Sequence, residues 1–265
     1  AGLHVLTEKP VAISLQDADK MIETRQRTGR KLGVIFQTRY TKSVEKLKEL
    51  MDAGYFGRIL SARSYLTWNR PHTYYEGSDW KGTWDREGGG VLIDQAIHSM
   101  DRVRYMLGSD IEWIEGSVHN HCHDTVRVED AAEAAIQFKN GCIYNLYACN
   151  SYASDAPITI EFQGEKGRCG LIQDMGFYEA DGCYTEIRNT YETTSVGPDY
   201  WGSSHHLQLR DFYESILCDR PVAIDAAEGR KTLEMVKGIY LSSLERRRVY
   251  LPFEDVCYKD LNTPK

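Results

Sequence analysis

Hydrophobic residues change their spacing twice along the chain, and each change marks a different kind of structure. Up to about residue 107, apolar residues recur every three or four positions in three stretches, which is typical of helices with one buried face. Ser14 precedes the first stretch as a candidate N-cap, and Gly29 follows it as a candidate C-cap. The expected helices cover residues 14–28, 43–51 and 88–107. The expected strands cover residues 3–10, 32–36 and 59–68, and the first of them runs into a charged turn.

From about residue 111, apolar residues alternate with polar ones, as in strands that bury one face. Asn140-Gly141 and Asp181-Gly182 separate such runs, and these pairs are strong signals for hairpins. The expected strands cover residues 111–121, 131–138, 142–149, 158–163, 168–173 and 183–188. Helical spacing returns at 204–218 and 226–245, before a last expected strand at 249–252.

This order of elements predicts an α+β fold in two parts. Residues 1–40 are expected to be the remnant of an α/β domain, and residues 41–265 a large, mainly antiparallel open sheet backed by helices. Helices 88–107 and 226–245 should cover one face of that sheet. The other face must be covered as well, and a second copy of the chain is the expected cover.

Composition narrows the class of partner. The net charge is −7 with acidic and basic residues interspersed, which argues against nucleic acid, because proteins that bind it carry a basic face. No stretch approaches the ~20 apolar residues of a membrane span. The seven cysteines show no C-x-x-C spacing and fit the reduced thiols of a cytoplasmic protein. A small-molecule partner is therefore expected.

The strongest candidate site lies where Gly88-Gly89-Gly90 opens the third expected helix. Asp94 and His98 are four residues apart, so they share one helix face. A carboxylate that orients an imidazole suits proton transfer near neutral pH, and glycines let the backbone approach a ligand closely. The same residues also fit a surface Asp–His pair beside a glycine-rich loop, and the spacing alone leaves both interpretations open.

Lys9 is a second candidate. Glu8-Lys9-Pro10 directly follows the first expected strand, and the carboxyl ends of strands are where ligands bind in open α/β sheets. A cation at this place could polarise a substrate oxygen. The alternative is a solvated surface lysine.

Two further clusters allow more than one interpretation. The long loop at 69–88, together with the residue before it, carries five aromatic residues that fit sugar stacking, loop packing or a dimer contact. They are Trp68, Tyr74, Tyr75, Trp80 and Trp84. His119, His121 and His123 alternate on one strand face and could bind a metal, but a solvated strand end is preferred, so no metal is predicted.

Several motifs in the same order resemble the glucose–fructose oxidoreductase / inositol dehydrogenase / rhizopine catabolism family (Gfo/Idh/MocA), above all its bacterial sugar dehydrogenases. Each motif is weak alone, whereas the order across nearly the whole chain is strong. The motifs are Glu8-Lys9-Pro10, Phe36-Gln37-Thr38-Arg39-Tyr40, Trp80-Lys81-Gly82-Thr83-Trp84 before the triple glycine with Asp94 and His98, His205 before Asp211-Phe212-Tyr213, Gly229-Arg230-Lys231-Thr232-Leu233-Glu234, and Val249-Tyr250-Leu251-Pro252.

The resemblance implies an oxidoreductase that uses NAD or NADP to act on a hydroxyl or ketone of a sugar, sugar derivative or polyol, with a Rossmann remnant in front. It implies that His98 is the acid/base, that Lys9 polarises the reacting oxygen, and that Asp94 orients and balances them. It further assigns cofactor contacts to Glu8, Lys9, Pro10 and Arg39. Substrate contacts are assigned to Trp80, Lys81, Trp84 and His205.

The chain departs from the family pattern in its front part. No G-x-G-x-x-G follows a strand. We therefore expect this chain to be the carboxyl-terminal three-quarters of an enzyme, and we expect the chain by itself to bind dinucleotides weakly. Two alternatives stay open, an NAD-assisted glycosidase of the same fold and a non-catalytic, truncated sugar-binding subunit. The expected assembly is a homodimer or homotetramer.

Overall fold

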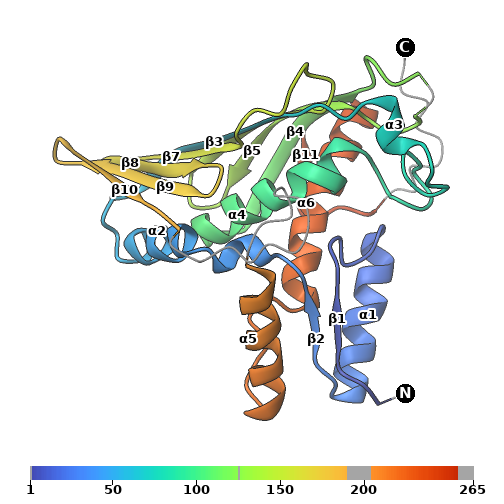
Figure 1. The fold of residues 1–265 in the computed structure, drawn as a ribbon, viewed down its shortest axis with the longest axis horizontal. Coiled ribbons are helices and arrows are strands. Elements are labelled where there is room, and N and C mark those ends of the chain that lie inside the picture. Colours follow the sequence, from blue (N-terminus) through green and yellow to red (C-terminus); the bar gives the residue numbers. More distant parts are fainter. Residues whose placement is uncertain (1, 125, 190–203, 256–265) are drawn as a thin grey trace.

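The computed structural model describes residues 2–124, 126–189 and 204–255, which form two sheets joined by helices (Figure 1). β1 (Val5–Thr7) and β2 (Leu32–Val34) form a parallel pair, connected by α1 (Leu15–Thr28). The second sheet has nine strands in the order β10-β9-β8-β7-β3-β6-β5-β4-β11. Adjacent strands of this sheet pair antiparallel, except that β3 and β6 pair with each other in parallel. The expected α+β fold, with a mainly antiparallel sheet backed by helices, is confirmed.

The remaining elements follow in chain order. They are η1 (Gln37–Tyr40), α2 (Lys42–Asp52), β3 (Ile59–Thr67), α3 (His72–Tyr75), the π-helical turn η2 (Leu92–Ala96), α4 (Ile97–Leu107), β4 (Ile111–His119), β5 (Ala131–Phe138), β6 (Ile143–Cys149), β7 (Thr159–Gly164), β8 (Gly167–Ile172), β9 (Met175–Ala180), β10 (Cys183–Ile187), α5 (His205–Leu217), α6 (Ala226–Glu245) and β11 (Val249–Tyr250).

Local sequence signals set several of these boundaries as expected. The Ser14 side chain accepts a hydrogen bond from the Asp17 N–H at the start of α1, and Gly29 ends the helix in the left-handed conformation. Gly108 ends α4 in the same way. Other details differ from expectation, since α3 lies where a loop was expected and β4 ends at His119. β9 was not predicted, and the third helix begins with a π turn at Leu92 rather than at the glycines.

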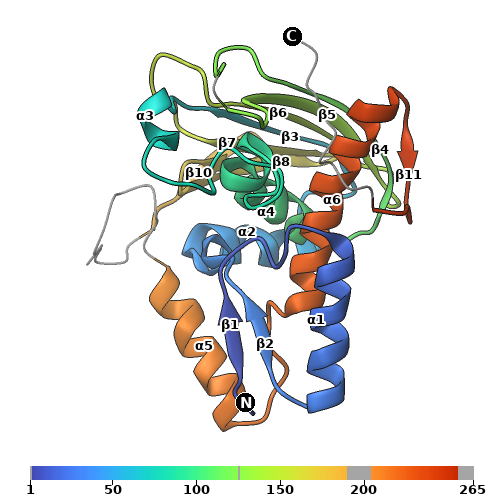
Figure 2. The same ribbon diagram turned by 90° about the vertical axis from the view of Figure 1, so that its right-hand side faces the viewer.

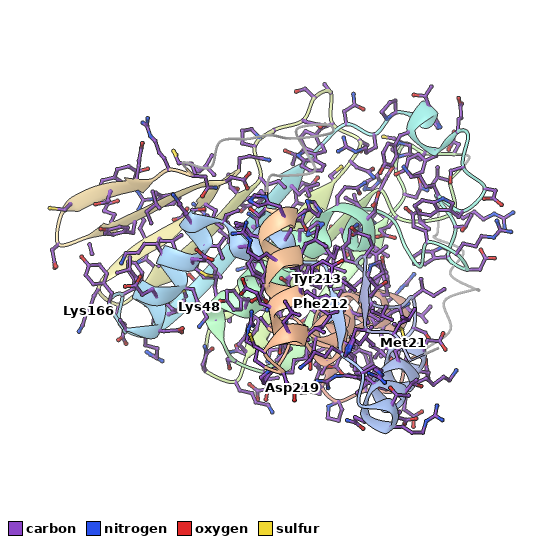
Figure 3. All side chains as sticks on the ribbon, turned by 60° about the horizontal axis from the view of Figure 1, so that its bottom comes forward. Met21, Lys48, Lys166, Phe212, Tyr213 and Asp219 are labelled. Carbon is purple, nitrogen blue, oxygen red and sulfur yellow. The ribbon has the colours of Figure 1, made fainter. Side chains whose placement is uncertain are left out.

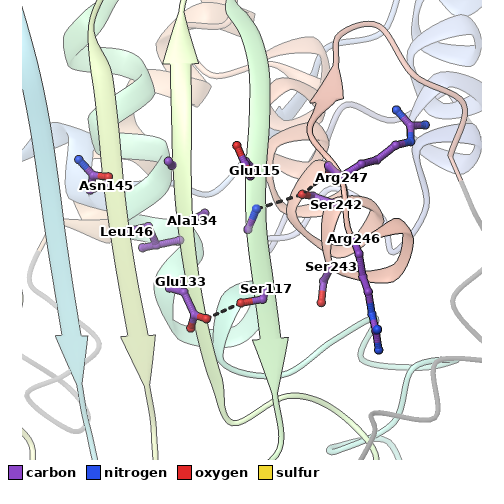
Figure 4. A pocket seen from close by; sticks show the side chains of 12 residues that line it. Glu115, Ser117, Glu133, Ala134, Asn145, Leu146, Ser242, Ser243, Arg246 and Arg247 are labelled. Atoms are coloured by element: carbon purple, nitrogen blue, oxygen red, sulfur yellow. Dashed lines mark hydrogen bonds between the residues drawn. The ribbon is translucent and has the colours of Figure 1, made fainter.

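The large sheet buries one face against α4 and α6, as Figures 1 and 2 show. Ile114, Ile136 and Tyr144, on three successive strands, are completely buried there. The opposite face is mixed rather than apolar, because exposed Tyr65 and Ile143 lie among charged side chains. On this face, a hollow of about 510 Å³ lies over β4, β5, β6 and the end of α6 (Figure 4). It lies away from the predicted site residues.

The two short strands are packed between α1 and α5 (Figure 2). Gln208 on α5 donates from Nε2 to the Val34 carbonyl (2.7 Å) and accepts from the Phe36 N–H (3.0 Å), so its amide continues the edge of β2. Phe212 is buried beside Gly33, where a Cβ would meet its ring at 3.1 Å (Figure 3). α5 is thereby fixed against the front unit.

Within the described residues, no helix is long and apolar enough to cross a membrane.

Candidate functional site

Lys9 and Asp94 connect the two parts of the molecule. Lys9 lies in the turn after β1, and its Nζ donates to the Asp94 carbonyl oxygen (2.6 Å) while lying 3.4 Å from Asp94 Oδ1. Asp94 Oδ2 accepts from the Tyr74 hydroxyl (2.7 Å) and from Gln95 Nε2 (2.6 Å). The carboxylate therefore holds the lysine on one side and the aromatic loop on the other. Asp94 itself lies in the π turn, a feature that is common at functional sites.

His98 lies one turn further along, in α4. Burial lowers its pKa well below the ordinary value, and the nearby charges of Lys9, Arg102 and His205 lower it further. Its Nδ1 is buried without a hydrogen-bond partner in the described part of the chain, and its ring meets the edge of Phe36 at 5.9 Å between centroids. The imidazole is therefore neutral near pH 7.

His205 reaches this cluster from the start of α5. The Gln208 bridge to β2 fixes the helix one turn after His205. His205 is close enough for its charge to lower the pKa of His98. The structure thus brings together Lys9, Asp94, His98 and His205, which are distant in sequence.

The triple glycine serves internal packing. The Glu129 carboxylate accepts from the Gly90 N–H (2.8 Å), the Leu92 N–H (3.0 Å) and the Tyr240 hydroxyl (2.8 Å). A Cβ on Gly89 would meet the Tyr240 oxygen at 2.0 Å, and one on Gly90 would meet the Glu129 carbonyl at 2.0 Å. The close approach that these glycines allow is therefore to the protein itself. The expectation that they approach a ligand is corrected accordingly.

Arg39 has a different place from the one expected. Its Nε and Nη2 donate to the two oxygens of Asp101 (2.7 and 2.6 Å), and Nη1 lies 3.4 Å from Glu228 Oε2. The guanidinium is buried, and these carboxylates raise its pKa even though burial opposes the charged form. Its charge is thus balanced inside the protein, and Arg39 ties η1 to α4 and α6. It is not available to a cofactor in this arrangement.

The predicted substrate residues of the aromatic loop fall into two groups. Trp80 is exposed, and Lys81 Nζ lies 3.7 Å from the centre of the Tyr74 ring. Trp84 instead packs edge-on against Tyr240 and donates from Nε1 to the Arg127 carbonyl (2.6 Å). Trp80 and Lys81 can therefore meet a ligand, whereas Trp84 anchors the loop to α6.

The three histidines at positions 119, 121 and 123 do not share one face. His119 and His121 stack on each other, but His123 is buried and bonded to Asp130 Oδ2 (3.0 Å) and the Arg70 carbonyl (2.6 Å). The strand ends at His119, so the alternation does not continue to His123.

Comparison with known proteins identifies the family. Residues 44–169 match the family model described as GFO/IDH/MocA C-terminal domain, and residues 1–36 match that described as oxidoreductase family, NAD-binding Rossmann fold. The chain belongs to the Gfo/Idh/MocA family. It is accordingly of an oxidoreductase family whose front domain binds NAD, and the resemblance inferred from the motifs is confirmed.

Individual relatives agree with this placement. The chain is 26% identical to the myo-inositol 2-dehydrogenase of Thermotoga maritima over 95% of its own length and 73% of that protein. It is 27% identical to the D-glucoside 3-dehydrogenase of Escherichia coli with the same two shares. A solved levoglucosan dehydrogenase, in complex with NADH and levoglucosan, superposes with a TM-score of 0.84 at 21% identity, over 95% of this chain and 74% of that one.

Sequence reasoning missed the residues that hold the site in place. Tyr74 was singled out only as an aromatic ring, whereas its hydroxyl binds Asp94. Glu129 and Tyr240 were not singled out at all, although they fix the glycine turn before Asp94. Glu129 lies just before β5 between Arg127 and Asp130, so its sequence neighbours do not distinguish it from an exposed acid.

Proposed function

We propose that the protein acts as an NAD(P)-dependent oxidoreductase on a hydroxyl or ketone of a sugar, sugar derivative or polyol. The observation that carries this is the contact of Lys9 Nζ with Asp94 beside a neutral, partly buried His98. A fixed cation and a neutral base at one place are what hydroxyl oxidation requires of a protein, since one stabilises the developing alkoxide and the other accepts the proton.

The residues present fit one end of a nicotinamide dinucleotide. The Glu8-Lys9-Pro10 turn lies at the carboxyl end of β1, where such ligands bind in parallel sheets, and Glu8 is exposed. The N-terminus of α1 does not offer a pyrophosphate site, because the Leu15 N–H donates to Asp255 (2.6 Å) and the Asp17 N–H to Ser14. When bound, the cofactor supplies hydride transfer.

The chain's own residues divide the remaining work. Lys9 presents its ammonium toward the reacting oxygen, and Asp94 fixes that ammonium through its carbonyl and carboxylate. His98 takes the hydroxyl proton in oxidation and returns it in reduction. His205 lies near His98, and its side chain adds a further polar contact for the substrate.

The experiment is a screen of the full-length enzyme with NAD and NADP against polyols, free aldoses and glycosides, following absorbance of the reduced cofactor. A reduced cofactor that appears with at least one sugar class, and disappears in the His98→Ala enzyme, supports the proposal. Aglycone release from an aryl glycoside without net cofactor reduction would instead show a glycosidase. Failure with every class would contradict both.

We further propose that the open face of the large sheet contacts a second copy of the chain. Tyr65 and Ile143 are 45% and 38% exposed on this face, and contact with a second copy would remove them from water. Sedimentation of the wild type and of Tyr65→Arg, Ile143→Arg tests this. A dimer or tetramer that dissociates in the double variant is expected, and a wild-type monomer at micromolar concentration would contradict it.

A further inference from the structure

Glu87 is a buried carboxyl group that the proposed chemistry does not use. It directly precedes the triple glycine, and its side chain is buried with only 6% of the residue exposed. Its Oε2 accepts a hydrogen bond from the Gly82 N–H, in the middle of the Trp80–Trp84 loop. Its Oε1 is buried and has no hydrogen-bond partner among the described residues. One hydrogen bond thus joins this carboxyl group to the loop.

Other contacts hold the loop at Thr83, at Trp84 and at the Gly82 carbonyl. The Glu87 and Gly88 N–H groups donate to the Thr83 carbonyl (3.1 and 3.2 Å), and the Gly82 carbonyl accepts from Arg127 N–H (3.0 Å). Lys81, next to Gly82, rests on the ring of Tyr74, whose hydroxyl binds Asp94. The position of Gly82 therefore determines where Lys81 lies relative to the Lys9–Asp94 pair.

Charges around Glu87 oppose its ionisation. Burial raises the pKa of Glu87 to about 8, and the carboxylates of Asp94 and Glu129 act in the same direction. The Gly82 hydrogen bond and the charge of Lys81 oppose them, and the phenols of Tyr74 and Tyr75 lie near enough for Glu87 to raise their pKa values. At pH 7 the group is mostly a neutral acid, so it adds no negative charge beside Asp94.

We propose that Glu87 is a positioning residue that holds the Trp80–Trp84 loop over the Lys9–Asp94 pair through the Gly82 N–H, and that it does so as a neutral acid. The substrate part of this inference rests on the proposed function. Ionisation of Glu87 places a third carboxylate beside Asp94 and Glu129, so the loop loosens as the pH rises through the pKa of Glu87.

The first measurement is independent of activity. Hydrogen exchange of peptides that span residues 80–84 is compared in the wild type, Glu87→Gln, Glu87→Ala and the control Glu76→Gln, an exposed glutamate of the same loop. After correction for the intrinsic pH dependence of exchange, the wild type should lose protection about tenfold between pH 7 and 9. Glu87→Gln should keep it, because its amide oxygen still accepts from Gly82 and cannot ionise, and Glu87→Ala should lack it at every pH.

The second measurement uses the full-length enzyme. Glu87→Ala is expected to raise KM for the sugar about tenfold with kcat changed less than threefold, because the loop binds substrate but does not handle the proton. Glu87→Gln should keep the wild-type KM at pH 7 and remove any rise in KM between pH 7 and 9. Glu76→Gln should match the wild type throughout.

The outcomes separate this inference from the proposed function. A wild-type enzyme without sugar oxidation overturns the proposed function, while the exchange data still decide whether Glu87 holds the loop. Unchanged protection in Glu87→Ala, or a Glu87→Gln protein that loosens above pH 8 as the wild type does, overturns the inference about Glu87. An equal fall of kcat in Glu87→Gln and Glu87→Ala without a change in KM would contradict a positioning role.

Discussion

The two sheets differ in how completely their edges and faces are covered. In the large sheet, the N–H groups of β4 beyond β11 donate to hydroxyls of α6, from Gly116 to Ser242 Oγ (3.0 Å) and from Val118 to Ser243 Oγ (3.1 Å). In the small sheet, Gln208 and the Ile224 carbonyl cover the edge of β2. Beside β1, however, Leu3 and Val5 are 71% and 47% exposed. The small sheet therefore leaves an apolar edge uncovered at β1.

The difference bears on how the site is built. Two strands of three residues bury little apolar surface, so the small unit depends on its contacts with α5 and α6 for its stability. The large unit supplies the buried helix that carries Asp94 and His98, but Lys9 comes from the small one. His98, the proposed acid/base group, thus lies in the large unit, whereas Lys9 comes from the small one.

The largest effect is expected at His98. His98→Ala in the full-length enzyme should lower kcat by about 10²–10⁴-fold, because proton transfer by a positioned base contributes that much. In the wild type, oxidation needs the neutral imidazole. The lowered pKa therefore moves the acid limb of kcat/KM below the ordinary histidine value of about 6.5. His121→Ala, at an exposed position, serves as the control and should leave the profile unchanged. An acid limb above pH 7 would contradict this account.

A smaller loss of kcat is expected when Lys9, which comes from the small unit, is replaced. Lys9→Ala should lower kcat by about 10²–10³-fold, since a positioned donor at a developing oxyanion is worth that much, and should weaken cofactor binding far less. Lys9→Arg should not restore the rate, because a planar guanidinium does not replace a compact ammonium. Lys20→Ala, an exposed lysine of α1, is the control. Steady-state kinetics with a cofactor titration decides, and a normal kcat in Lys9→Ala would rule out its role.

Stability provides the next comparison, at the junction between η1, α4 and α6. Asp101→Ala should lower the free energy of unfolding by about 3–5 kcal/mol, because it leaves the buried Arg39 without its main partner. Glu49→Ala, which breaks the exposed pair with Lys46, should cost about 0–1 kcal/mol. Urea unfolding followed by circular dichroism measures both. Equal losses in the two variants would mean that the Arg39 pair does not join the parts.

The sequence predicted the elements that depend on local signals. The N-cap at Ser14, the glycine ends of α1 and α4, and most strands of the large sheet follow from period and turn chemistry within a few residues. β9 escaped because Gln173, in the left-handed region at φ 55°, and Asp174 turn the chain directly into a short strand that begins Met175-Gly176. The residues before Cys183 do not alternate between apolar and polar over a stretch long enough to predict a strand.

The contacts that define the site could be predicted only in part. The motifs named Lys9, Asp94 and His98, and the structure brings them together, but their roles in catalysis stay a prediction. The Arg39 side chain is held by Asp101, 62 positions away, and the Glu129 side chain by Tyr240, 111 positions away. Such pairings carry no local signal, because a charged residue in a single sequence looks the same whether it meets a ligand or a buried partner.

The smallest effect is expected on the outer surface of α5, and it tests how open the small unit is. Leu209, Tyr213 and Leu217 recur every four residues and are 41%, 63% and 83% exposed, next to buried Phe212 (Figure 3). Tyr213→Ala in this chain should change the free energy of unfolding by less than about 0.5 kcal/mol, as surface substitutions do, whereas the neighbouring Phe212→Ala should cost about 3–5 kcal/mol. Urea unfolding of the two variants, followed by circular dichroism, makes the comparison. A loss above about 1 kcal/mol for Tyr213→Ala would show that this face of α5 is covered in solution, and the small unit would then be less open than its exposed side chains indicate.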